Sequence, residues 1–101
     1  MTFLADALPK QTEKQFMSQV VRYAELMGWR VHHTFDSRKS SPGVPDLLCI
    51  RRPRVVWAEL KSDRGRLTDD QRAWLLDLRA CGQEAYLWSP RNWSAVEKLL
   101  R

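Results

Sequence analysis

Two short apolar segments of this chain end beside side chains that are able to bind a metal ion. Asp46 stands directly before the segment 47–50, and Glu59 and Lys61 come after the segment 55–58. Because side chains alternate along a strand, Glu59 and Lys61 are predicted to share one face of it. Two carboxylates and an amine in this arrangement suit magnesium chemistry on phosphate esters. The same pattern is also compatible with solvated charges at an exposed strand end.

The chemistry assigned to this set follows from its donor atoms. Asp46 and Glu59, together with a backbone carbonyl and waters, make an ordinary magnesium shell. A cation in that shell polarises a scissile phosphate and lowers the pKa of a bound water. Lys61 is then expected either to orient that water or to stabilise the charge that develops on the phosphorane.

Two polar residues at predicted helix starts are further candidates. Glu13 falls on the same helical stripe as Phe16 and Val20, and Gln71 stands in the same relation to Trp74. An unpaired polar group under a core costs roughly 1–3 kcal/mol, so inward-facing groups need partners such as a metal site. The alternative is that both side chains serve as caps in their first turns. Gln71 already has a capping role, which makes Glu13 the stronger candidate.

The histidines, arginines and lysines near the proposed site are candidates for holding a substrate. Adjacent histidines, His32 and His33, point to opposite faces of a strand and cannot share a ligand site without distortion. The arginines of the segment 51–54 are as well explained by solubility or protection of a strand edge as by DNA. Two basic loops flank the proposed site and are predicted to hold phosphates through Arg38, Lys39, Arg64 and Arg66.

Composition narrows the class of protein. Lysine and arginine outnumber aspartate and glutamate by 17 to 12, which favours a polyanionic partner such as nucleic acid, although solubility alone explains the excess equally well. Cys49 and Cys81 have no metal-binding spacing, so we expect neither a disulfide framework nor a zinc site. The sequence contains no membrane span and no signal-peptide core, and we expect a cytoplasmic protein without a membrane partner.

The sequence pattern predicts one domain over residues 1–101, with a loose lead-in at 1–10. Capping boxes at Thr12 and Thr68 open two helices that end near Gly28 and Gly82. The expected order of elements is α-β-β-β-α-β-α. The last two strands are joined through a helix, and this connection is long enough for them to be parallel neighbours. We therefore predict an α/β fold with a mixed four-stranded sheet flanked by helices. The other predicted elements are strands at 29–35, 47–50, 55–58 and 84–88, loops at 36–45 and 62–67, and a last helix that begins at Ser89-Pro90.

These motifs, taken together, resemble the VRR-NUC family of the PD-(D/E)XK nuclease superfamily. The resemblance covers nearly the whole chain, and no matched position departs from the family pattern. It implies a restriction-endonuclease-like core that hydrolyses phosphodiester bonds with Mg²⁺ or Mn²⁺ and needs no small-molecule cofactor. It is carried, in order, by Glu13, Gly43-Val44-Pro45-Asp46, Glu59-Leu60-Lys61-Ser62 and Leu67-Thr68-Asp69-Asp70-Gln71.

The resemblance also implies a role for each matched residue. Asp46 and Glu59 correspond to metal ligands, with the Leu60 carbonyl beside them. Lys61 corresponds to the catalytic lysine. Glu13 corresponds to an additional acid that reaches the metal directly or through water, and Gln71 to a residue that orients Lys61 or the attacking water.

Short, stand-alone members of this family are similar to phage and bacterial proteins that dimerise. A symmetric dimer has two active sites, which suits paired cuts in a branched substrate such as a four-way (Holliday) junction during DNA repair. Our first hypothesis is therefore a homodimeric, metal-dependent, structure-selective DNA endonuclease. The alternatives are a non-catalytic DNA-binding module of the same fold and an interaction protein that binds no nucleic acid. Asp46 and Glu59 disfavour the module, because binding alone gains nothing from two acids facing a phosphate.

Overall fold

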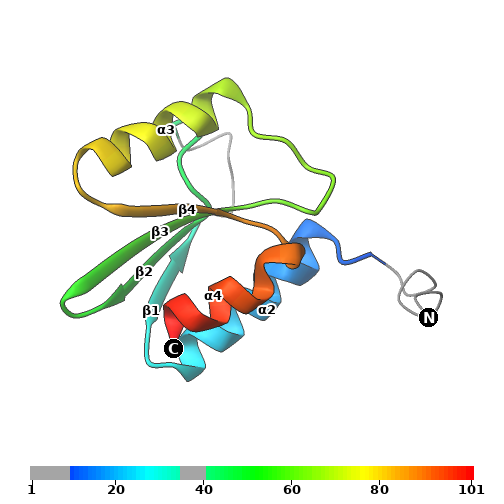
Figure 1. Cartoon of the computed structure of the whole chain (residues 1–101), viewed down its shortest axis with the longest axis vertical. Coiled ribbons are helices and arrows are strands. Elements are labelled where there is room, and N and C mark those ends of the chain that lie inside the picture. Colours follow the sequence, from blue (N-terminus) through cyan, green and yellow to red (C-terminus); the bar gives the residue numbers. More distant parts are fainter. Residues whose placement is uncertain (1–9, 35–40) are drawn as a thin grey trace.

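The computed structural model describes residues 10–34 and 41–101 (Figure 1). Phe35, Arg38, Lys39 and nearly all of the predicted lead-in lie outside these residues. The order of elements is the predicted α-β-β-β-α-β-α, with a short 3₁₀ turn added before the last helix. The elements are α2 (Glu13–Leu26), β1 (Arg30–His33), β2 (Leu47–Arg51), β3 (Arg54–Leu60), α3 (Asp69–Ala80), β4 (Glu84–Trp88), η1 (Pro90–Asn92) and α4 (Trp93–Leu100).

The four strands form one mixed sheet in the order β1-β2-β3-β4. The pairs β1–β2 and β2–β3 are antiparallel, whereas β3 and β4 are parallel and are connected through α3. In the β2–β3 register Leu47 lies opposite Ala58, so the residues that immediately precede β2 meet the end of β3. This register brings Asp46 beside Glu59, and it confirms the predicted sheet.

Both helices with predicted capping boxes begin where the sequence indicates. The Thr12 hydroxyl accepts a hydrogen bond from the Gln15 amide at 3.1 Å, and the Gln15 side chain accepts one from the Thr12 amide at 2.9 Å. Thr68 and Gln71 form the same reciprocal pair at the start of α3. These bonds satisfy backbone donors that a helix start otherwise leaves free, and they fix where α2 and α3 begin.

Helices α2 and α4 pack together on one face of the sheet, and α3 lies on the other side of β4 (Figure 1). Side chains at alternate strand positions, including Cys49, Val56 and Ala58, are fully buried under α2 and α4. They meet Phe16 and Val20 from α2, which are also fully buried. Within the described ranges, no helix has the length and apolar character needed to cross a membrane.

Two arginines of the β2–β3 hairpin hold the helix ends in place. Arg51 donates a hydrogen bond to the Met27 carbonyl at 2.8 Å, and Arg54 donates one to the Leu99 carbonyl at 3.0 Å. Both guanidinium groups lie over the Trp29 ring, 4.6 and 5.1 Å from its centroid. Their positive charge meets the carbonyl ends of α2 and α4, where the helix dipole favours it. Arg51 and Arg54 therefore have a structural role that the sequence pattern did not indicate.

Candidate active site

Asp46 is held at the junction of three elements, at the end of the sheet where β2 begins. Its carboxylate oxygen Oδ2 accepts a hydrogen bond from the Leu60 amide at 2.8 Å, which ties the side chain to the end of β3. Its backbone carbonyl accepts a hydrogen bond from the Thr34 amide at 3.0 Å, just beyond β1. These two bonds fix both the backbone and the side chain of Asp46 before any ligand binds.

Glu59 and Lys61 lie side by side at the end of β3, as strand alternation predicts. The Lys61 ammonium is 3.5 Å from the Glu59 carboxylate, and their side chains are 14% and 2% exposed. The Lys61 amide donates to the Trp88 carbonyl at 2.9 Å, so pairing with β4 fixes the lysine backbone. Burial, together with repulsion by Asp46, raises the pKa of Glu59 to about 8 against the opposing attraction of Lys61. The structure thus brings Asp46, Glu59 and Lys61 together.

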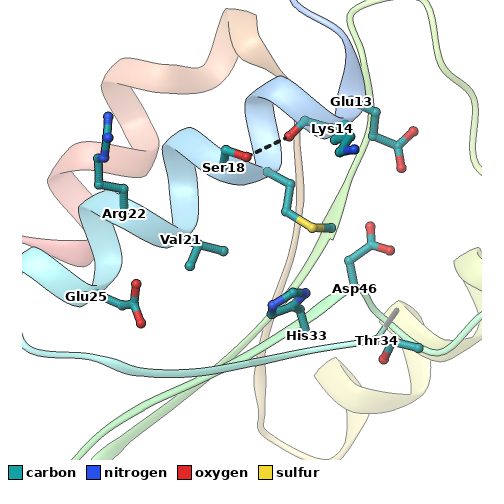
Figure 2. A pocket seen from close by; sticks show the side chains of 10 residues that line it. Glu13, Lys14, Ser18, Val21, Arg22, Glu25, His33, Thr34 and Asp46 are labelled. Carbon is teal, nitrogen blue, oxygen red and sulfur yellow. Dashed lines mark hydrogen bonds between the residues drawn. The ribbon is translucent and has the colours of Figure 1, made fainter. Parts of the chain in front are cut away.

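Glu13 lies at the edge of this group, at the start of α2. Figure 2 shows the carboxylates of Glu13 and Asp46 directed toward one another. The expectation that Glu13 is turned under the core is wrong, since the residue is exposed. Glu13 lies in the first turn of α2. There the apolar stripe of the helix has passed the end of the sheet, so the side chain has no core to face. Partial burial raises the pKa of Glu13, Lys61 opposes this rise, and Asp46 adds to it, so Glu13 is electrostatically part of the site.

The acidic group suits a hydrated divalent cation. The repulsion that raises the pKa of Glu59 is relieved when a cation lies between it and Asp46. Over residues 10–34 and 41–101, no three His, Cys, Asp or Glu side chains form a ready-made metal-binding group. Mg²⁺ does not require one, because it keeps several waters and is commonly held by one or two carboxylates. The donor set therefore fits Mg²⁺ or Mn²⁺, with the Leu60 carbonyl as the predicted additional ligand.

The remaining predicted residues lie at different places around this group. Arg64 and Arg66 are exposed, and Arg64 lines with Glu13 a hollow of about 330 Å³ beside the site. Gln71 uses its amide oxygen to cap α3, and its predicted action on Lys61 or on a water stays a prediction. Arg38 and Lys39 fall outside the described residues.

The loop after β3 supports Lys61 through contacts that the sequence pattern did not reveal. A Cβ atom added to Gly65 would lie 3.1 Å from the Lys61 Cβ, so a larger residue there would press on the lysine stem. Asp63 fixes this loop to the turn after β4, where its carboxylate accepts a hydrogen bond from the Arg91 amide at 3.0 Å. The Arg91 side chain also donates to the Asp63 carbonyl at 2.5 Å. No periodic signal marks such contacts, because they depend on tertiary structure alone.

A groove of about 840 Å³ runs from Glu13 and Asp46 along α2 and the end of β1 (Figure 2). His33 lines this groove, although from its sequence position we expected it to be mainly structural or at the surface. Lys14 and Arg22 of α2 also border it, and neither was among the predicted DNA contacts. The four-residue interval between Lys14, Ser18 and Arg22 is the sequence signal that places them on one side of the helix.

The turn that delivers Asp46 depends on a glycine at position 43. Gly43 has a φ of +85°, and an added Cβ atom would lie 2.4 Å from the Asp70 carbonyl carbon. We expect Gly43→Ala to destabilise the fold by about 2–3 kcal/mol, because backbone strain and a clash with α3 add together. Urea denaturation of both proteins measures this loss.

Gly82→Ala is the matched control for this substitution. Gly82 has a φ of +80°, but nothing lies within 4 Å of an added Cβ atom. It should therefore lose only the backbone contribution, about 1 kcal/mol. Equal losses in the two variants would show that the contact with Asp70 does not matter.

The comparisons with known proteins agree with this fold. The mixed four-stranded sheet with its flanking helices is the α/β fold expected of a nuclease domain. The VRR-NUC domain pattern matches residues 5–89, and the chain belongs to the VRR-NUC family of nuclease domains. Among solved structures, the chain is similar to Hjc, a Holliday junction resolvase from the hyperthermophilic archaeon Archaeoglobus fulgidus, with a TM-score of 0.57 and 23% identity over 76% of this chain and 68% of that one. No curated protein sequence matches the chain.

Proposed function

We propose that this chain is a single nuclease domain over residues 1–101 that cuts branched DNA in a reaction dependent on Mg²⁺ or Mn²⁺. The observation that carries the proposal is the buried Glu59 carboxylate, whose neighbours are the Asp46 carboxylate and the Lys61 ammonium at 3.5 Å. A buried acid with a perturbed pKa beside a second acid and an amine is costly for stability, and it is typical of catalytic sites.

In this proposal each residue has a definite task. Asp46, Glu59 and the Leu60 carbonyl hold the cation, which when bound supplies Lewis-acid activation of the phosphate and of a water. Lys61 orients the attacking water or stabilises the charge on the phosphorane oxygens. Glu13 contacts the cation directly or through a water, and Gln71 orients Lys61 or the water. As the water oxygen bonds to phosphorus and its proton passes to solvent, the opposite phosphorus–oxygen ester bond breaks and the leaving oxygen takes up a proton from solvent.

The preference for branched DNA and the homodimer are parts of the same proposal. The similarity to a Holliday junction resolvase in fold supports a substrate with a branch point. A two-fold dimer presents two sites related by symmetry, as paired cuts across a four-way junction require. Arg64 and Arg66, with Arg38 and Lys39, are then the expected contacts to phosphates. A role in DNA repair follows from such a substrate.

The test uses a labelled four-way junction and a linear duplex of matched sequence, each with Mg²⁺, Mn²⁺ or EDTA. We expect cutting with either metal, none with EDTA, and a clear preference for the junction. Light scattering on the same preparation reports the oligomeric state. DNA binding without cutting in every metal would instead identify a non-catalytic module. Equal cutting of both substrates would refute the structural selectivity.

A further inference from the structure

The groove along α2 opens directly onto the proposed catalytic group. Glu13 and Asp46 lie at one end of it, and Glu25 lies at the other (Figure 2). Between these ends, Met17 and Val21 give it an apolar wall. A ligand lying in this groove would therefore be continuous with whatever is bound at Asp46.

One border of the groove carries positive charge at regular intervals. Lys14, Ser18 and Arg22 are exposed and follow one another every four residues along α2. Each step advances roughly 6 Å along the helix, which is close to the interval between neighbouring phosphates of an extended strand. The two cations, two such steps apart, match the backbone of a nucleic acid, and the Ser18 hydroxyl between them donates to the Lys14 carbonyl at 3.2 Å (Figure 2).

We propose that this groove binds one DNA strand at the branch point, next to the scissile phosphate, with Lys14 and Arg22 as its phosphate contacts. A volume of about 840 Å³ is that of a small-molecule site, so the groove accepts one or two nucleotides but not a duplex. Met17 and Val21 offer apolar contact to sugar or base surfaces that a duplex would keep stacked. The inference rests on the proposed function and names the part of the substrate that the groove recognises.

The charges at the two ends of the groove limit how far the strand extends. At the catalytic end, Asp46 and Glu59 would be offset by the cation that they are proposed to hold, which would let a phosphate approach. At the far end, Glu25 opposes any further phosphate beyond Arg22. The chemistry therefore favours a short segment that starts at the cut site.

Fluorescence anisotropy with a labelled four-way junction tests the proposal, with Ca²⁺ replacing Mg²⁺ and a series of salt concentrations. Lys14→Gln combined with Arg22→Gln should weaken binding about tenfold and lower the slope of log K against log salt by about 1.4, the value for two phosphate contacts on a single strand. Ser18→Trp fills the groove at an exposed position and should weaken binding to a similar extent. Glu25→Gln should strengthen it.

The control removes two charges at the opposite end of the sheet. The double variant Lys98→Gln, Arg101→Gln changes the C-terminal end of α4. Arg51 donates a hydrogen bond to the Arg101 carbonyl, and Arg51 is the last residue of β2, at the opposite end of that strand from Asp46. If the groove double variant and Ser18→Trp bind as the control does, the groove assignment is wrong while the nuclease proposal stands. If the unaltered protein neither binds nor cuts DNA in any metal, the proposed function itself fails.

Discussion

Replacing Lys61 by alanine is expected to slow phosphodiester cleavage by about 100- to 1,000-fold, the size of effect seen when a positioned proton-transfer or charge-stabilising group is removed. The ammonium lies 3.5 Å from Glu59 and its side chain is only 14% exposed, so bulk water cannot easily take its place. DNA affinity should change little, because the contacts that we assign to phosphates belong to other residues. The measurement is the single-turnover rate on the four-way junction, together with the dissociation constant in Ca²⁺.

Two comparisons make this result specific. Lys98→Ala removes an equivalent charge from an exposed position on α4 and should cut at the original rate. Circular dichroism of Lys61→Ala should match that of the unaltered protein, since Lys61 follows the end of β3 and its backbone pairing with Trp88 does not need the side chain. A Lys61→Ala protein that cuts as fast as the control would remove this lysine from the mechanism.

Sequence reasoning located Asp46, Glu59 and Lys61 because the rules behind it are local. Strand alternation fixes the shared face of Glu59 and Lys61, and the short hairpin fixes the register that sets Asp46 beside them. The two capping boxes could be predicted for the same reason, because each of their hydrogen bonds joins residues only three positions apart.

Tertiary packing decides the features that the sequence did not reveal. Gly43 meets Asp70, and Gly65 meets Lys61, at distances set by how whole elements pack. The groove exists because α2 packs beside the end of β1 and Asp46, and tertiary structure alone sets their relative placement. Glu13 was expected under the core because helical periodicity places it on the apolar side of α2. Periodicity does not show, however, that the sheet ends before it reaches this turn of the helix.

Replacing Glu59 by glutamine is expected to abolish metal-dependent cutting, a loss of at least about 100-fold, and also to stabilise the metal-free protein at alkaline pH. The pKa of Glu59 is raised from 4.5 to about 8 by burial and by Asp46, so the folded state holds this proton more tightly than the unfolded chain. Between these two pH values, stability must fall as the pH rises, by at most about 1.4 kcal/mol per pH unit. Glutamine carries no such charge and removes this fall.

Thermal unfolding from pH 5 to 9, with and without Mg²⁺, measures both consequences. Without metal, the unaltered protein should lose several degrees of Tm per pH unit relative to Glu59→Gln, given the usual ~4–8 °C per kcal/mol for a domain of this size. Mg²⁺ should restore Tm at pH 8–9 only in the unaltered protein, because the cation stabilises the ionised carboxylate pair and binding releases the Glu59 proton. Glu13 remains in both proteins, and the raised pKa of its carboxyl comes from partial burial and Asp46 against Lys61, not from Glu59. If the two proteins gave parallel curves of Tm against pH and the same response to Mg²⁺, Glu59 would neither bind the metal nor lower the stability of the metal-free protein.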